Sequence, residues 1–196
     1  MDNPESLILI VLVIISSRHN VLDKAGIIAA IVLGSVVGFL GHWTWLGILL
    51  GFLASSHKVT KWRFDEKAEK GLCESKDGHR SWGNVIANGG LPGIAAIFSF
   101  MNADWENGIW LFSAAVAVAT ADTFASEIGC LDDRVRMLTT MKPCEAGLNG
   151  GFSPNGQKAA AVGSLAIAAL TTCAWLLSGG GAVEGLILAT VVAIIG

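Results

Sequence analysis

Residues 105–128 read WENGIWLFSAAVAVATADTFASEI, and this stretch decides the fold class. Its middle, from Gly108 to Ala121, contains no charged residue. A helix that spans the hydrocarbon core of a bilayer needs about 20 mostly apolar residues, which this stretch supplies. We therefore expect a membrane-spanning helix here, with the carboxylates of Asp122 and Glu127 close to one of its ends.

Apolar stretches of the same kind lie on both sides of this segment, and together they predict about seven helices. The expected ranges are 6–17, 25–40, 43–55, 84–101, 105–128, 158–177 and 182–195. Several connections are short, so consecutive helices should be antiparallel. The first helix is short enough to lie in the interface instead of crossing. The predicted fold class is all-α: a polytopic transmembrane bundle of about 6–7 membrane helices forming one domain, residues 1–196.

Composition supports this class. Of the 196 residues, 53% are hydrophobic and 15% are charged, and the mean hydropathy is +0.59, outside ordinary soluble usage. A net charge of -3 gives no overall basic field, so no nucleic-acid partner is expected. The four cysteines have no C-x-x-C spacing and favour neither a zinc site nor a disulfide framework. Acidic Asp2 and Glu5 precede the first apolar run, so we expect it to stay as an anchor.

All 13 basic residues fall in alternate connections or at the helix ends beside them. They are Arg18, Lys24, Lys58, Lys61, Arg63, Lys67, Lys70, Lys76, Arg80, Arg134, Arg136, Lys142 and Lys158. Lys and Arg in short loops remain on the cytoplasmic side of a membrane. The distribution therefore predicts a multi-pass protein of the cell membrane, whose long loops, about 56–83 and 129–157, carry the active site on the cytoplasmic face.

The first candidate site is the stretch ADTFASEIG at residues 121–129. At 100° per residue, Asp122, Thr123, Ser126 and Glu127 fall within about 140° of one helix face. A carboxylate at membrane depth costs about 2.5 kcal/mol or more, so it normally faces a partner, a cavity or an ion. One interpretation is that water or a lysine satisfies these helix-end carboxylates. The other is that Asp122 and Glu127 hold Mg²⁺, which prefers carboxylate and phosphate oxygens.

The second candidate is the glycine-rich stretch GLNGGFSPNG at residues 147–156, which leads into a predicted helix. Glycines let backbone N–H groups converge on an anion, and a helix N-terminus adds a favourable dipole. The stretch is also compatible with an ordinary turn. As a phosphate site it would use Asn149, Gly150, Gly151 and Ser153. The same loop would add the hydroxyls of Thr139 and Thr140 and the cation of Lys142.

The third candidate is the basic loop before the fourth predicted helix, together with the start of that helix. Most of its charges are compatible with a solvated surface, and we single out Lys58, Lys61, Glu74 and Arg80 as candidate site residues. Asn84 and Asn88 are four residues apart and so share one helix face. The following Gly89, Gly90 and Pro92 favour a closely packed or broken segment that lines a cavity.

The order and spacing of three motifs resemble one family of integral membrane proteins, which includes the plant phytyl-phosphate kinase of tocopherol synthesis. The motifs are ADTFASEIG at 121–129, LTTMKP at 138–143 and GLNGG at 147–151. The stretches GHR at 78–80, IANGG at 86–90 and residues 55–61 are also similar. The resemblance covers about residues 30–165.

This resemblance implies transfer of the terminal phosphoryl group of CTP to a prenyl monophosphate of the phytyl, geranylgeranyl or farnesyl type. Asp122, Glu127, Lys142 and Arg80 would then be the catalytic residues. The implied partners are a nucleoside triphosphate, an isoprenoid phosphate lipid and the membrane, and a homodimer is compatible. Two alternatives stay open: a CTP-dependent lipid-phosphate cytidylyltransferase, and an ion-coupled transporter, whose inverted repeat the sequence does not show.

Overall fold

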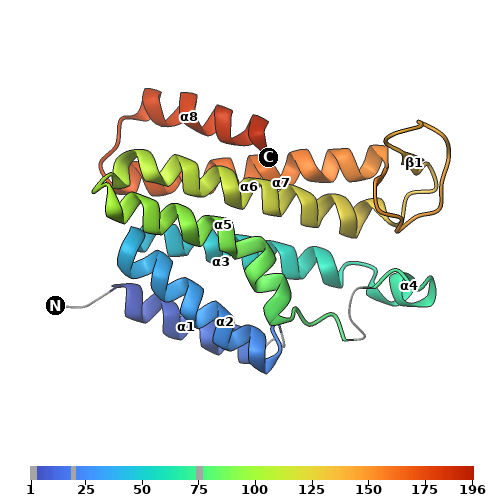
Figure 1. Cartoon of the computed structure of the whole chain (residues 1–196), viewed down its shortest axis with the longest axis horizontal. Helices are drawn as coiled ribbons and strands as arrows, with labels where there is room; N and C mark the ends of the chain where they lie inside the picture. Colours follow the sequence, from blue (N-terminus) through green and yellow to red (C-terminus); the bar gives the residue numbers. More distant parts are fainter. Residues whose placement is uncertain (1–3, 19–20, 74–76) are drawn as a thin grey trace.

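The computed structural model describes residues 4–18, 21–73 and 77–196, and this part of the chain is mostly helical (Figure 1). Its eight α-helices are α1 (Pro4–Arg18), α2 (Lys24–Val36), α3 (Trp43–Lys61), α4 (Phe64–Glu69), α5 (Trp82–Met101), α6 (Trp105–Gly129), α7 (Pro154–Leu177) and α8 (Ala182–Ile195). A π-helical turn, η1 (Val37–Gly41), continues α2. Two short strands, β1 (Arg136–Met137) and β2 (Gly151–Phe152), pair in antiparallel fashion within the loop between α6 and α7.

All seven predicted helices are present, which confirms the helical fold class. Four helical segments in the described residues are long and apolar enough to cross a membrane: Lys24–Gly41, α5, α6 and α7. The helices near the two chain ends are apolar but shorter. The predicted number of six or seven membrane-spanning helices therefore stays a prediction. The sequence did not predict α4 or the two strands, because each is too short to show a hydrophobic period.

Several helices extend beyond their predicted bounds, α3 and α7 furthest, and the extensions shorten the predicted loops to residues 62–81 and 130–153. The helix α3 continues to Lys61 through polar residues, and Lys58 and Lys61 lie in its last turn, where cations interact favourably with the helix dipole. The helix α7 begins at Pro154, because the Ser153 side chain accepts a hydrogen bond from the Gly156 N–H at 3.1 Å.

The helix α6 lies at the centre of the bundle and packs against α3, α5, α7 and α8. Phe112 is fully buried and stacks on Trp45 with ring centroids 4.9 Å apart. Where the end of α6 meets the start of α7, a Cβ added to Gly156 would lie 3.2 Å from the Cα of Gly129. Small residues allow this close backbone approach. It fixes the two ends of the loop that carries β1 and β2.

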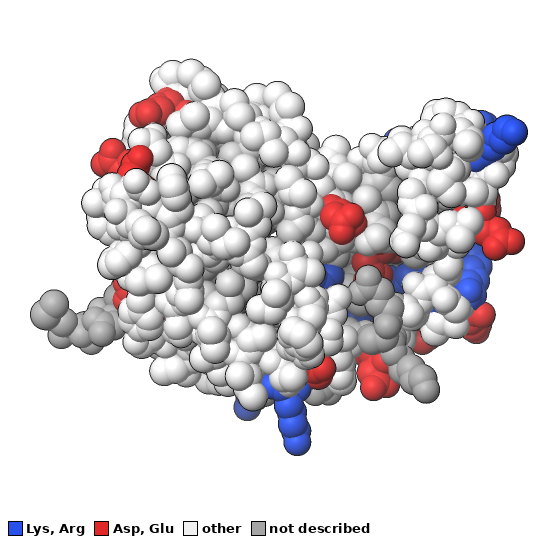
Figure 2. All heavy atoms as spheres, in the orientation of Figure 1, with Lys and Arg blue, Asp and Glu red and all other residues white. Residues whose placement is uncertain are grey.

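Basic side chains gather at the end of the bundle that carries this loop and α4, and at the connection between α1 and α2 (Figure 2). The opposite end shows acidic atoms and no basic ones on the face in view. This segregation agrees with the predicted alternation of the basic connections. The side of the membrane that the basic end faces stays a prediction.

Candidate functional site

A cavity of about 360 Å³ lies between the last turns of α6, the first turn of α7 and the loop that joins them. Figure 2 shows the surface hollowed between the helices and this loop, with acidic atoms in view there. The lining residues are Leu72, Asp122, Ala125, Ser126, Gly129, Cys130, Val135, Gly147, Leu148, Asn149, Gly150, Gly151, Phe152, Ser153, Gly156 and Gln157. The structure therefore brings the predicted carboxylate Asp122 and the predicted glycine-rich loop into one cavity.

Asp122 is the acidic residue of this cavity. It lies seven residues before the end of α6, which places it about 10 Å along the helix axis from that end. Its side chain is exposed and has no hydrogen bond or ion pair with any other residue that the structure describes. An unpaired carboxylate at this depth is costly in a membrane unless a cation or water reaches it. Asp122 is therefore available to bind a cation in the cavity.

The glycine-rich loop supplies backbone N–H groups. Gly147 and Gly150 have φ angles of +85° and +83°, which only glycine adopts at no steric cost. The Leu138 N–H donates to the Gly150 carbonyl at 2.8 Å, which ties the loop to the residue after β1. Within the described residues, the N–H groups of 147–150 have no acceptor. Successive free N–H groups at such a turn are the usual way in which backbone binds an anion.

The start of α7, by contrast, is already capped from within the protein. The Asn155 N–H donates to the Asp132 carboxylate at 3.0 Å, and the Gly156 N–H donates to the Ser153 hydroxyl at 3.1 Å. That hydroxyl is buried and itself donates to the Gly129 carbonyl at 3.2 Å. Ser153 therefore serves as a helix cap, and the first turn of α7 offers few donors to a phosphate.

Asp132 contributes to this end of α7, although no motif in the sequence singles it out. Its carboxylate accepts two hydrogen bonds from the Arg134 guanidinium, at 2.9 and 3.1 Å, besides the one from Asn155. The hydrogen bonds from Arg134 are the main reason that the pKa of Asp132 falls to about 2. The stabilisation is complete above the ordinary aspartate pKa of about 3.9 and disappears as the pH falls through about 2. Asp132 thus holds the loop to α7 at physiological pH.

Glu127 lies outside this cavity. Its Oε2 accepts a hydrogen bond from Lys67 Nζ at 2.6 Å, and its Oε1 accepts one from the Thr60 hydroxyl at 2.8 Å. The Lys67 ammonium, 1% exposed, also donates to the carbonyls of Val59 and Thr60. Five residues of helix turn Glu127 about 140° away from Asp122, so the two carboxylates face different neighbours. The predicted metal pair is not assembled here, and the interpretation of a lysine-satisfied carboxylate holds for Glu127.

Lys67 was predicted only as part of a solvated charge run. It lies on α4, whose sequence FDEKAE is too short to reveal which face is buried. No motif in the sequence could have paired it with Glu127, which is 60 residues away along the chain. The contact depends on the position of α4, from which the Lys67 side chain reaches the end of α3 and Glu127 on α6.

Arg80 and Asn84 lie on the far side of the Glu127 pair. The Arg80 guanidinium donates to the Thr60 hydroxyl at 3.4 Å and lies over the Phe52 ring, 5.9 Å from its centroid. Asn84 accepts hydrogen bonds from the Ser81 N–H and hydroxyl, both at 3.0 Å, and so caps α5. Both residues line a second, mostly apolar cavity.

The other predicted residues lie outside the first cavity. Thr139, Thr140 and Lys142 are exposed at the turn that follows β1. Lys61 donates to the Asp77 carbonyl at 2.7 Å, and Lys58 is exposed on α3. Asn88 is half-buried on α5. The predicted residue Glu74 lies outside the described residues.

Replacing Gly150 by alanine should impair ligand binding in the cavity. The positive φ angle costs about 1–2 kcal/mol for a residue with a Cβ, and the new Cβ would lie 3.3 Å from Met137 Sδ. We expect the affinity of the purified protein for phosphate-containing ligands, the class that this loop is predicted to bind, to fall several-fold. Gly179→Ala is the matched control, because Gly179 has a φ of +88° and open space around it at the opposite end of the bundle. Equal affinity in both variants would contradict a role for this turn.

The fold and this cavity define a polytopic helical membrane protein with a polar site at one end of its bundle. Residues 7–196 match the family described as Integral membrane protein DUF92, and the chain belongs to this family. It is therefore an integral, multi-pass membrane protein. No solved structure matches the chain.

Several curated proteins are similar to the chain. An uncharacterized membrane protein of Methanocaldococcus jannaschii, MJ0933, is 30% identical over 162 residues, which cover 82% of this chain and 66% of that protein. Protein PGR of Arabidopsis thaliana is 29% identical over 182 residues, covering 82% of this chain and 62% of the relative. The uncharacterized membrane protein sll0875 of Synechocystis is 28% identical over 155 residues, covering 76% and 59%. The chain thus spans about three fifths to two thirds of the length of these relatives.

Proposed function

We propose that this protein is a membrane-embedded phosphotransferase that moves the terminal phosphoryl group of a nucleoside triphosphate to a prenyl monophosphate, giving the diphosphate. CTP is the expected donor, from the resemblance to the phytyl-phosphate kinase family. The observation that carries the proposal is that one cavity is lined by Asp122 and by residues 147–150, whose N–H groups have no acceptor among the described residues. Phosphoryl transfer depends mainly on holding the reacting groups in line and neutralising charge on phosphate oxygens.

The reaction needs little further chemistry from the protein. An oxygen of the prenyl monophosphate forms the new bond to the γ-phosphorus, and the bond between this phosphorus and the β-γ bridging oxygen breaks. The electron pair stays on that oxygen, and the nucleoside diphosphate leaves. Because the second pKa of a phosphate monoester is about 6, the attacking oxygen is already deprotonated at neutral pH. A general base is therefore not required, and the absence of a histidine from the lining described for the cavity is compatible with the reaction.

The residues of the cavity fit a magnesium ion that is shared with the substrate. Within the described residues there is no cluster of three or more His, Cys, Asp or Glu side chains that could hold a metal alone. Mg²⁺ is typically held by one or two carboxylates and by substrate phosphates, so Asp122 is sufficient on the protein side, and Asn149 also lines the cavity. The bound ion would neutralise charge on the phosphate oxygens, while the N–H groups of 147–150 orient them.

This fit predicts that nucleotide binding requires the metal. No Lys or Arg is among the residues described as lining the cavity, so a triphosphate there would face the carboxylate of Asp122 without a compensating cation. Chelating Mg²⁺ should therefore lower nucleotide affinity by about 10²-fold or more, as expected when a charge is left unpaired in a site of this kind. Equilibrium binding of CTP to the detergent-purified protein, with and without EDTA, measures this. Unchanged affinity would contradict the proposed role of Asp122.

Product analysis tests the proposed reaction against its nearest rival. The purified protein is incubated with Mg²⁺, each nucleoside triphosphate and a panel of prenyl monophosphates. Release of CDP and formation of a prenyl diphosphate would support the phosphotransferase. Release of pyrophosphate and formation of a CDP-linked lipid would instead indicate a cytidylyltransferase, which could use the same residues. If no nucleotide is consumed while a cation gradient drives uptake of a solute into vesicles, the protein is a transporter.

A further inference from the structure

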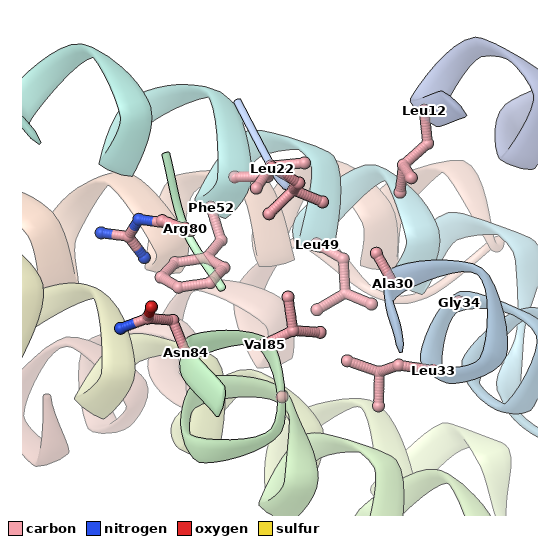
Figure 3. Close-up of a pocket in the computed structure, with 12 residues that line it drawn as sticks. Leu12, Leu22, Ala30, Leu33, Gly34, Leu49, Phe52, Arg80, Asn84 and Val85 are labelled. Atoms are coloured by element: carbon pink, nitrogen blue, oxygen red, sulfur yellow. The ribbon is translucent and has the colours of Figure 1, made fainter. Parts of the chain in front are cut away.

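A second cavity lies between α1, α2, α3 and α5, and its lining divides into an apolar part and a polar end. The close-up in Figure 3 shows Arg80 and Asn84 together at one end, with Leu33, Ala30, Gly34 and Leu12 toward the other. Leu22, Leu49, Phe52 and Val85 line the space between them. Gly34 lies ten residues after the start of α2, so the apolar part reaches about 15 Å into the bundle from the loop end.

Arg80 is held at this polar end by the backbone as well as by its side chain. Its N–H donates to the Val21 carbonyl at 3.0 Å, and its carbonyl accepts from the Asp23 N–H at 3.1 Å. These bonds tie Arg80 to the connection between α1 and α2. Its guanidinium lies over the Phe52 ring, which leaves it between the apolar cavity and Thr60. A guanidinium at the end of an apolar cavity is matched to an amphiphile with a phosphate head.

A short chain of hydrogen bonds connects this end to α6. Arg80 donates to the Thr60 hydroxyl at 3.4 Å, Thr60 donates to Glu127 at 2.8 Å, and Lys67 donates to the same carboxylate at 2.6 Å. Glu127 lies on the turn of α6 that also contributes Ser126 and Cys130 to the first cavity. Arg80 and Glu127 also line a small polar pocket beside Thr60, so the hydrogen bonds lead from the polar end of the second cavity to this turn of α6.

We propose that the second cavity holds the hydrocarbon tail of a single-chain lipid monophosphate, with its phosphate head at Arg80. For the reaction that this lipid undergoes, the inference rests on the proposed function; the binding itself does not need a nucleotide. The free space is narrow, about 50 Å³, so a long tail enters only if side chains such as Leu33 turn aside. Leu33 lies on the α5 side of this space, where its Cδ2 packs against the backbone of Gly89.

The test measures lipid binding to the purified protein, residues 1–196, in detergent and without nucleotide, by native mass spectrometry and competition. The probes are farnesyl and geranylgeranyl monophosphate, the two corresponding alcohols and inorganic phosphate. Leu33→Phe, which narrows the cavity, should weaken binding of the longer monophosphate by about tenfold or more, in the range by which an apolar pocket discriminates chains by size. Leu33→Ala, which only removes atoms, should shift the preference toward the longer chain. Val32→Phe is the matched control, because Val32 is 61% exposed on the outer face of the same helix.

A variant at Arg80 distinguishes the contribution of the phosphate head of the lipid from that of its tail. Arg80→Gln should weaken both monophosphates by about tenfold or more while leaving the alcohols unchanged, because only the phosphate meets the guanidinium. If lipid binding changes in these variants as expected but the protein transfers no phosphoryl group, the lipid-binding cavity is supported and the phosphotransferase is overturned. If phosphoryl transfer occurs but all three variants at Leu33 and Arg80 bind lipid as the wild type does, the phosphotransferase is supported and the lipid cavity is overturned. Complete displacement of the lipids by inorganic phosphate would show that the tail contributes nothing, and would overturn the inference.

Discussion

Replacing Asp122 by asparagine is expected to reduce phosphoryl transfer by about 10²–10³-fold, the range found when one charge-stabilising group is removed from an active site. The change is isosteric, and the carboxylate has no partner among the described residues whose loss would weaken the fold. The loss should therefore appear in kcat and in Mg²⁺-dependent nucleotide affinity, while the melting temperature stays close to that of the wild type. Initial rates with CTP at several Mg²⁺ concentrations measure both effects.

Asp133→Asn is the control for this change. Asp133 is an exposed aspartate in the loop between α6 and α7, and it is not among the residues that line the cavity. Both variants remove one negative charge from this end of the bundle, so a general electrostatic effect would appear in both. Full activity of Asp122→Asn, or an equal loss in Asp133→Asn, would remove Asp122 from the proposed metal site.

The apolar helices could be predicted from the sequence because membrane helices are recognisable by their length and apolar composition. The run before Asp122 and the runs on either side were placed to within a few residues. The ends were less predictable where polar residues continue a helix, as in α3, since a hydropathy pattern stops at the last apolar residue. The short helix α4 and the strands β1 and β2 are stabilised by contacts with residues that are distant in the sequence. A local sequence pattern does not reveal those contacts.

The sequence predicts that Asp122 and the glycine-rich loop lie together, but it does not predict that Glu127 faces away from them. Asp122 and Asn149 share a cavity because α6 and α7 are antiparallel neighbours, and the motifs at their adjoining ends are brought together by that topology alone. The side of α6 on which each carboxylate acts could not be predicted, because it depends on which helix covers each face. Glu127 faces α3 and α4, where Lys67 and Thr60 already occupy both of its oxygens.

The role of the glycine-rich stretch also differs from the simplest prediction. The predicted phosphate site comprises Asn149, Gly150, Gly151 and Ser153, with a favourable dipole from the following helix, but Ser153 and Asp132 cap that helix from within the protein. The free N–H groups lie earlier in the stretch, between the two glycines with positive φ. The glycines are therefore recognisable from the sequence, whereas the helix cap that Asp132 forms is not, because no motif contains this aspartate.

The second large effect is expected at Lys67, which holds the loop between α3 and α5 against α6. Lys67→Met removes an ammonium that is 1% exposed and leaves Glu127, 18% exposed, without its cation. Breaking a buried ion pair by removing one partner costs about 3–5 kcal/mol. We expect a large fall in the melting temperature of the purified protein, and a loss of Arg80-dependent lipid binding, because Thr60 connects Glu127 to Arg80.

Two further variants decide whether the effect comes from the pair itself. Lys70→Met removes a lysine of similar length from the end of the same short helix, where it forms an exposed pair with Glu66, and it should leave the melting temperature unchanged. Adding Glu127→Gln to Lys67→Met removes the stranded charge, so the double variant should recover a large part of the lost stability. If Lys67→Met melts like Lys70→Met, the buried pair does not hold the loop. If the double variant is less stable than either single variant, Glu127 stabilises the bundle through contacts other than Lys67.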